Sequence, residues 1–329
     1  MKHPPYHLRT NKAVDRLLLV DVLRRLGPHY DQMTYYTLAG PFLEDLRVID
    51  HFFPDIHLVS LESNEQTFNR QNFHKFTSNV DLRRRTLADF LAHDYKPGVR
   101  DIFWLDYTDL KYARFGEFQG VLQQVPDGSV VRITLRAEQE IDLDRLRDRV
   151  SAAELSRVQA ELETEFVDMY RAILPSPTPS AFSHPKQFAR TVQLMVRLAA
   201  SAALDTAGSE RDYLPIHSIR YNDNTQMLTV TGIVCNRNSI DATKEQLKSV
   251  RFVDFDWNEP IEVNIPDLSI KERLHLESQL PIPSGSDAGT ILYETLAYMT
   301  ADNAKATKNQ LARYADFFRE YPHFIRLTI

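Results

Sequence analysis

Residues 35–45 read YYTLAGPFLED, and the change from a strand pattern to a helical pattern within this stretch predicts the fold. An apolar strand pattern comes first, Ala39, Gly40 and Pro41 then form a turn, and a helical pattern follows. A strand that enters a helix through a glycine is a common way for α/β proteins to hold a nucleotide-like ligand. The dinucleotide-binding pattern has three glycines, whereas this turn has one. The turn is therefore either a cofactor site or an ordinary strand-to-helix connection.

Strands and helices alternate on both sides of this turn. Strand patterns occupy residues 33–39, 56–62, 100–109 and 129–137, and helical patterns occupy 12–26, 42–53 and 64–76. Such alternation favours a parallel sheet with crossover helices. Farther along the chain, two β-type runs at 215–221 and 227–235 flank the turn-forming residues NDNTQ, which predicts an antiparallel hairpin.

The remaining segments predict the domain organisation. Residues 138–205 are mostly helical in pattern and form an insertion before the hairpin, with a proline-rich loop at 175–180. Residues 250–329 mix a short strand at 251–257, a loop at 281–289 and two helices. We expect an α/β domain over residues 1–235, including the insertion at about 138–205, and an α+β extension over 236–329 packed on it.

Composition and charge limit the function classes. The formal net charge is −6 and the pI is about 6.0, so bulk charge does not favour nucleic acid as a partner, although a local basic patch stays open. The one cysteine, Cys235, excludes an intramolecular disulfide and a multi-cysteine metal site. The first residues lack the apolar core of a signal peptide, and no window approaches a membrane-spanning length. These features predict a cytoplasmic protein.

The order of elements, a parallel alternation followed by a late antiparallel hairpin, resembles the class I S-adenosylmethionine-dependent methyltransferases. The resemblance covers residues 10–235. It implies an α/β fold with a Rossmann-like methyltransferase sheet, mostly parallel with a terminal antiparallel hairpin, plus helical additions. It also implies S-adenosyl-L-methionine as cofactor and an unknown methyl acceptor. In that family the turn after the first strand approaches the methionine part of the cofactor, and here it is formed by Leu38, Ala39 and Gly40.

Two further positions follow from the resemblance. The second strand of the family ends in an acid that binds the ribose hydroxyls, which here implies Glu62 with Ser63 beside it. A carboxylate suits this role because it can accept hydrogen bonds from both hydroxyls. The position that meets the adenine falls on Leu87, Ala88 and Asp89.

The fourth strand of the family ends near the methyl donor, and here it has an acidic end. The resemblance implies Asp106 as a cofactor-binding residue, and Asp106 or Asp109 as the candidate base. Carboxylates at the carboxyl end of a buried parallel strand point at the usual binding crevice. More ordinary interpretations stay open, because Glu62 also suits a helix N-terminus and Asp89 also suits a helix cap.

Three hypotheses of function remain. The first is a methyltransferase whose cofactor lies at the ends of strands one, two and four. The second is a catalytically inactive methyltransferase-like protein that binds or regulates a partner, for example as a homodimer, and the single glycine of the turn favours it. The third is a dehydrogenase, which the missing G-x-G-x-x-G pattern and the late hairpin oppose.

Overall fold

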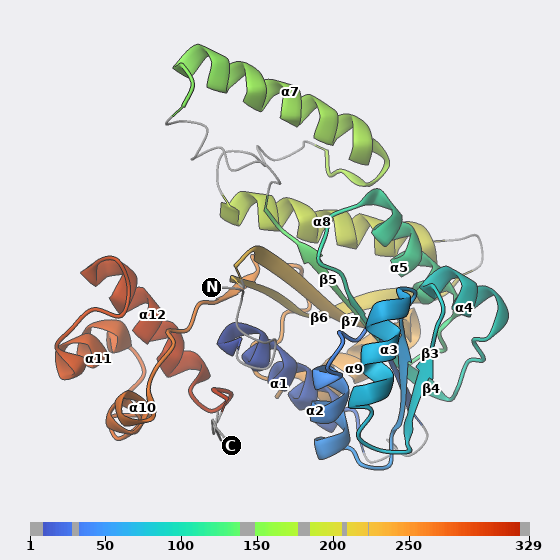
Figure 1. Cartoon of the computed structure of the whole chain (residues 1–329), viewed down its shortest axis with the longest axis horizontal. Helices are drawn as coiled ribbons and strands as arrows, with labels where there is room; N and C mark the ends of the chain where they lie inside the picture. Colours follow the sequence, from blue (N-terminus) through green and yellow to red (C-terminus); the bar gives the residue numbers. More distant parts are fainter. Residues whose placement is uncertain are drawn as a thin grey trace. The chain divides into compact units, whose positions relative to one another are not determined.

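A computed structural model of the chain describes residues 9–27, 33–138, 149–176, 185–205, 209–222 and 224–322. Its centre is an eight-stranded sheet in the order β3-β2-β1-β4-β5-β7-β6-β8 (Figure 1). The strands are β1 (Met33–Thr37), β2 (His57–Leu61), β3 (Val80–Arg83), β4 (Arg100–Asp106), β5 (Val130–Arg136), β6 (Arg211–Asn222), β7 (Gln226–Asn236) and β8 (Ile261–Val263).

The first five strands are parallel and the hairpin strand β7 reverses the direction. β7 pairs antiparallel with β5 from Val130↔Ile233 to Arg136↔Met227. The predicted fold class, a mostly parallel Rossmann-like sheet with a terminal antiparallel hairpin, is confirmed. From β1 the chain builds β2 and β3 on one side and β4 and β5 on the other, so the order of strands reverses between β1 and β4.

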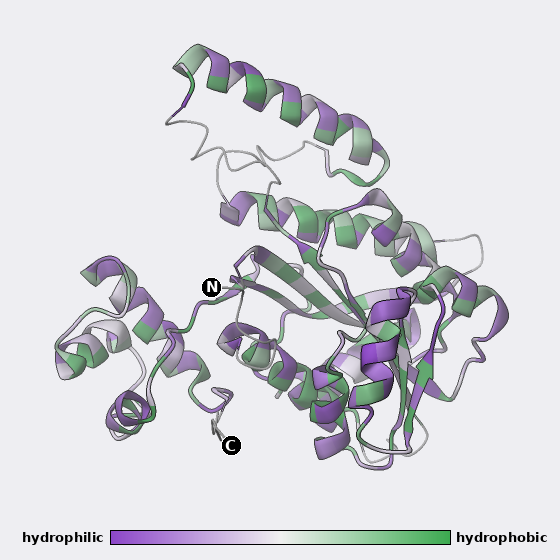
Figure 2. Ribbon diagram, viewed as in Figure 1, coloured by the Kyte–Doolittle hydropathy of each residue, from purple (hydrophilic) through white to green (hydrophobic). Residues whose placement is uncertain are grey.

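Helices alternate with the strands along the chain. They are α1 (Thr10–Arg25), α2 (Glu44–Phe52), α3 (Glu65–His74), α4 (Leu87–His93), α5 (Tyr112–Gln124), α7 (Ala152–Tyr170), α8 (Pro185–Leu204) and α9 (Ile240–Leu247). The helices α5 and α8 run side by side over one face, which buries an apolar core around Tyr36, Phe103 and Val131 (Figures 1 and 2).

The opposite face carries a row of buried side chains that is largely polar. The pairing registers place Ser60, Thr37, Trp104, Arg132 and Thr231 beside one another across five strands. Each of these side chains is at most 1% exposed. Because buried polar groups need hydrogen-bond partners, this row constrains how the strands and their covering helices fit together.

Contacts divide the chain into two compact units, each with its own packing. One unit comprises the described parts of residues 22–220 and 225–261 and holds most of the sheet. The other comprises the described parts of 1–21, 221–224 and 262–329 and includes α10 (Ile270–Glu277), α11 (Ala288–Leu296) and α12 (Ala304–Phe317). Compact units are not the same thing as domains, so the domain boundary expected near residue 235 stays a prediction.

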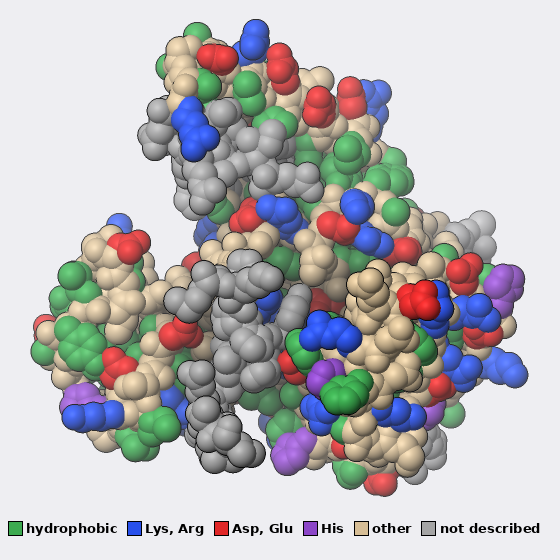
Figure 3. All heavy atoms as spheres, viewed as in Figure 1, with side chains coloured by type: hydrophobic (Ala, Val, Ile, Leu, Met, Phe, Trp, Pro, Cys, Tyr) green, Lys and Arg blue, Asp and Glu red, His purple; other side chains and the backbone are tan. Residues whose placement is uncertain are grey.

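The three-helix part of the smaller unit is closely packed inside and partly apolar outside. A Cβ added to Gly289 on α11 would lie 2.3 Å from the carbonyl oxygen of Lys308 on α12, so only glycine allows this approach. Hydrophobic side chains are exposed over these helices (Figure 3), among them Ile270 at 66% and Leu274 at 64%.

Several local expectations are corrected. The strand expected at 251–257 does not form, and the next strand is β8 instead. The C-terminal region has three described helices rather than two, and β3, α5 and α9 are additional elements. Most of the proline-rich loop at 175–180 and the segment 324–329 lie outside the described residues.

Candidate functional site

The carboxyl ends of three neighbouring strands bring most of the predicted residues to one edge of the sheet. Thr37 at the end of β1 pairs with Ser60 of β2 on one side and with Trp104 of β4 on the other. The turn at residues 38–40, Glu62 and Asp106 therefore lie at this shared edge, which we call the switch-point edge. In open α/β sheets, ligands bind in the crevice where the strand order reverses.

A buried side-chain amide stabilises the turn after β1 by hydrogen bonding. The side chain of Gln71, on α3, is fully buried and donates a hydrogen bond from Nε2 to the carbonyl oxygen of Ala39 at 2.6 Å. Its Oε1 accepts from the hydroxyl of Ser60 at 3.1 Å. The amide therefore ties the turn to both α3 and β2. The N–H of Leu38 also reaches the carbonyl of Trp104, at 3.4 Å, which links the turn to β4.

Gly40 has no steric reason to be glycine within the described chain. A Cβ added there would meet no described heavy atom within 4 Å, and the φ angle of Gly40 lies outside the left-handed range. The left-handed residue of this connection is Leu43, with φ of 57°, directly before α2. A side chain at position 40 would thus point into open space at the switch-point edge, which suits a backbone that a ligand approaches closely.

Glu62 directly follows β2 and is half-buried. Its Oε1 accepts a hydrogen bond from the backbone N–H of Asn64 at 2.6 Å, just before α3 begins. Its second oxygen accepts nothing from the described residues, so it is available to a ligand hydroxyl. The helix-terminus interpretation and the ribose interpretation are therefore compatible, because each uses a different oxygen. Ser63 beside it is exposed.

The positions predicted to meet adenine lie at the start of α4. Leu87 is buried in the apolar core and can meet a ligand only through its backbone, whereas Ala88 and Asp89 are exposed. The Thr86 hydroxyl donates to Asp89 Oδ2 at 2.7 Å and accepts from the Asp89 N–H at 3.1 Å. Asp89 thus takes part in capping α4, and its role toward adenine stays a prediction.

Asp106 ends β4 and faces the polar row. Burial and the negative charges of Asp45 and Asp106 hold the pKa of Tyr35 well above its ordinary value, while Arg132 opposes them. The guanidinium of Arg132 lies 4.4 Å from the ring centroid of Trp104 and donates to the Thr231 hydroxyl at 3.0 Å. Asp106 therefore lies on the same face of the sheet as Arg132, and its charge acts on the buried phenol of Tyr35.

Asp109 has a different environment. Its two oxygens accept hydrogen bonds from Arg114 at 2.9 and 3.1 Å, and Lys111 lies 2.9 Å away. Burial alone would raise the pKa of Asp109, but the hydrogen bonds and charges of these two cations lower it below its ordinary value. A carboxylate held ionised in this way is a weak proton acceptor.

The same loop is fixed by a second acid and a tyrosine. The Tyr107 hydroxyl donates to Glu117 at 2.6 Å, and Arg114 bridges Glu117 and Asp109. The guanidinium of Arg114 also lies 4.5 Å from the centroid of the Tyr107 ring. The geometry suits a structural role for Asp109 in the β4–α5 loop, and its predicted catalytic role stays a prediction.

Sequence reasoning placed Gln71 either at a helix end or in the site wall, and it missed the hydrogen bonds by which Gln71 and the polar row support the turn. A signal was present, because Ser60, Thr37 and Arg132 interrupt strands that otherwise read as apolar.

Within the described residues no group of three or more potential metal ligands clusters. No described helix is long and apolar enough to cross a membrane.

Comparisons with solved structures give distant likenesses. They include a possible exported protein from Bordetella parapertussis (12% identity, 70% of each chain, TM-score 0.39). The plantazolicin methyltransferase BpumL in complex with SAH shows 12% identity over 68% of this chain and 85% of that one, at a TM-score of 0.37. An O-methyltransferase family protein from Burkholderia thailandensis shows 11% identity over 69% of this chain and 58% of that one, at 0.33. At these values the likenesses carry no argument about function.

The family assignment comes from the sequence as a whole. No curated protein matches the chain. A family model described as "Putative O-methyltransferase" matches residues 4–329, which is nearly the entire chain. The sheet order and the switch-point edge agree with that match. The chain therefore belongs to this methyltransferase family.

Proposed function

We propose that the protein is an S-adenosylmethionine-dependent methyltransferase whose cofactor binds at the switch-point edge. The observation that carries the proposal is Gly40, a glycine that neither backbone conformation nor packing within the described chain requires. It stands at the point of the sheet where α/β proteins bind their ligands. Family membership supports the reaction class, and the position of Gly40 supports the switch-point edge as the cofactor site.

The residues of this edge fit such a cofactor. The open space at Gly40 allows a ligand to contact the backbone, and the second oxygen of Glu62 can accept from ribose hydroxyls. Gln71 would keep the turn at residues 38–40 in place through its hydrogen bond to the carbonyl of Ala39. The bound cofactor supplies an electrophilic methyl group on a sulfonium, and transfer then depends mainly on positioning the acceptor in line with it.

The chain must also handle the proton of a hydroxyl acceptor. Asp106 is the better candidate for accepting that proton, because Asp109 is held by two cations and its pKa is lowered. Asp106 lies at the carboxyl end of β4, directly across the strand-order reversal from the turn at 38–40. The methyl acceptor itself and a homodimer stay predictions.

The test is calorimetric titration of the purified protein with S-adenosylmethionine and S-adenosylhomocysteine, with NAD as the control ligand. We expect saturable binding of the first two only. In the variant Gly40→Ala, the new methyl group should weaken this binding by at least about tenfold, the size of one lost close contact or hydrogen bond. Folding stability should stay equal or rise slightly, because alanine restricts the unfolded chain.

The matched control is Gly116→Ala on α5, where an added Cβ also meets nothing within 4 Å. This variant should keep full cofactor affinity. Absence of binding for both sulfur ligands, or equal affinity in the Gly40→Ala variant and the wild type, would remove the cofactor from this edge. Binding without transfer of a labelled methyl group to any fraction of a cell extract would favour the inactive, binding-only alternative.

A further inference from the structure

A cavity of about 250 Å³ lies at the opposite edge of the sheet, within the larger compact unit. Its walls come from α8, the start of β6, α9 and the segment that follows α9. They are Arg197, Ala200, Ser201, Asp212, Tyr213, Leu214, Pro215, Ile240, Lys244, Phe255 and Trp257. We call it the amino-edge cavity.

Pairing registers place this cavity away from the switch-point edge. Ile233 near the end of β7 pairs with Val130 at the start of β5, so the end of β7 lies at the amino edge of the parallel strands. The N–H of Arg237, just after β7, donates to the carbonyl of Glu210, just before β6, which puts the start of β6 at the same edge. The cavity is therefore separate from the proposed cofactor site.

Two cations of the cavity wall are left without ionic partners in the described part of the chain. Arg197 on α8 is exposed and has no ion pair there, and Lys244 on α9 has only a ring contact, 5.7 Å from the centroid of Phe255. Within the described residues the carboxylate of Asp212 accepts only the N–H of Tyr213, at 2.7 Å. Two cations against one carboxylate leave the cavity with an excess of positive charge, which favours an anion.

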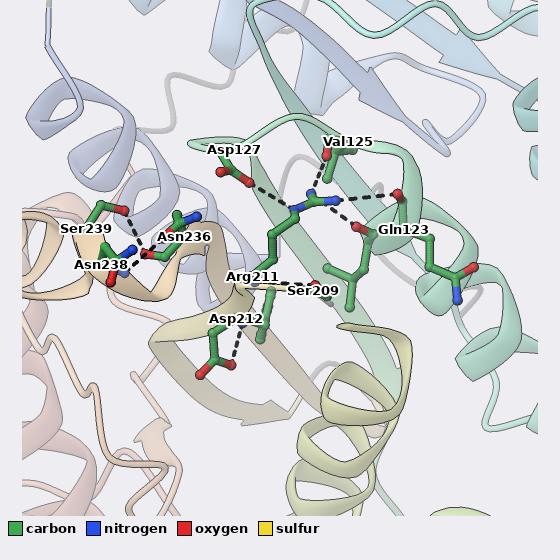
Figure 4. A network of polar contacts seen from close by, with 11 residues as sticks. Gln123, Val125, Asp127, Ser209, Arg211, Asp212, Asn236, Asn238 and Ser239 are labelled. Atoms are coloured by element: carbon green, nitrogen blue, oxygen red, sulfur yellow. Dashed lines mark hydrogen bonds and ion pairs between the residues drawn. The ribbon is translucent and has the colours of Figure 1, made fainter. Parts of the chain in front are cut away.

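The neighbouring arginine does not neutralise Asp212. Figure 4 shows the guanidinium of Arg211 turned away from Asp212 and toward Asp127, which it contacts at 2.9 Å, and toward carbonyls at the end of α5. Because Arg211 is occupied in this way, Asp212 remains able to accept a hydrogen bond from a ligand.

The aromatic wall is held in a strained conformation. Trp257 has a φ of 56°, which a bulky side chain rarely adopts. Asp254 accepts the N–H of Asn258 at 2.7 Å, and Arg190 donates to the Trp257 carbonyl, so the backbone is fixed on both sides. The indole N–H has no acceptor among the described residues. Strain maintained by such contacts is typical of functional sites.

We propose that the amino-edge cavity binds a small anion that carries a single flat ring, an aromatic or heteroaromatic carboxylate or phosphate ester. Arg197 and Lys244 would bind the anionic group, while Phe255 and Trp257 contact the ring. Asp212 and the indole N–H would meet a donor and an acceptor on the ring. The volume lies just below the usual range for pockets that hold drug-sized ligands, so it suits one ring rather than a dinucleotide.

The test is calorimetric titration of the full chain with phenyl phosphate and benzoate, with inorganic phosphate and benzyl alcohol as partial ligands. We expect saturable binding of at least one ring anion and weaker binding of both partial ligands. Lys244→Met and Arg197→Met should each lower its affinity by about tenfold, as expected for the loss of one charge-assisted hydrogen bond. The exposed position of Arg197 makes that variant safe for folding.

Lys248→Met is the matched control, because Lys248 lies just after α9, is 65% exposed and does not line the cavity. It should keep the wild-type affinity. The proposal is overturned if neither ring anion saturates, if inorganic phosphate binds as tightly as phenyl phosphate, or if the control loses as much affinity as the two cavity variants. Since binding itself is measured, the result does not depend on methyl transfer.

Discussion

At the scale of single residues, the switch-point edge depends on side chains that hold its turn in place and have no proposed part in catalysis. Gln71 joins three segments through one amide group, using its nitrogen for Ala39 and its oxygen for Ser60. No hydrophobic residue of the same size can replace both bonds. Its position on α3, 32 residues from Ala39 along the chain, explains why the sequence does not reveal its bond to the turn.

We expect Gln71→Leu to destabilise the fold by about 1–3 kcal/mol, because a buried carbonyl and a buried hydroxyl lose their partner. It should also weaken S-adenosylmethionine binding, since the turn at 38–40 is no longer fixed. Urea denaturation and calorimetry measure the two effects. Asn72→Ala on the same helix, where the side chain is exposed, should change the stability by less than about 0.5 kcal/mol. Equal effects of both substitutions would contradict the role of Gln71.

Asp109 gives a prediction about pH. Its folded-state pKa is lowered below the ordinary 3.8, so folding favours the ionised form. The stability that Asp109 contributes is therefore complete above its unfolded pKa and is lost as the pH falls through its folded pKa. We expect Asp109→Asn to be less stable than the wild type at pH 7, and the difference to shrink as the pH falls below about 4. Urea denaturation between pH 7 and about pH 2 measures this, and a difference that stays constant would contradict the ion-pair role.

At the scale of elements, long and strongly patterned segments were predictable, and short or strained ones were not. The strands around residues 33–37 and 100–106 follow from their apolar runs. The strand β3 has four residues and reads as a basic cluster because it ends in Arg83. The segment 251–257 alternates like a strand, yet Phe252 and Trp257 adopt left-handed φ angles of 58° and 56°, which interrupt extended pairing.

The pair α11 and α12 offers a test of close helix packing. Gly289→Ala would place a methyl group 2.3 Å from the Lys308 carbonyl oxygen, so one helix must move. We expect a loss of about 1–3 kcal/mol from overpacking. Gly116→Ala is the same substitution in a helix position with open space, and it should be neutral or stabilising. Thermal unfolding followed by circular dichroism compares them, and equal melting temperatures would show that α11 and α12 can separate without cost.

At the scale of the whole molecule, the sequence predicted which strand ends meet at the switch-point edge, but not the buried side chains that hold this edge together. Strand ends can be read from a pattern, and parallel strands bring their carboxyl ends together, so Gly40, Glu62 and Asp106 lie at one edge, while their roles toward a cofactor stay predictions. The polar row and the amino-edge cavity combine residues from strands and helices far apart in the chain. Such combinations depend on register and packing, which no local pattern encodes.

The unneeded glycine of the first turn has a consequence for the history of this family. The turn has room for a Cβ at position 40 and needs no left-handed φ there, so neither packing nor backbone conformation selects for glycine at this position. On the proposed function, only the ligand keeps glycine there. A descendant that abandons methyl transfer is then free to drift at this position while every other part of the sheet is maintained. The residue at position 40 would then distinguish the two kinds of descendant: an alanine, serine or valine there would mark a lineage that no longer binds the cofactor for methyl transfer.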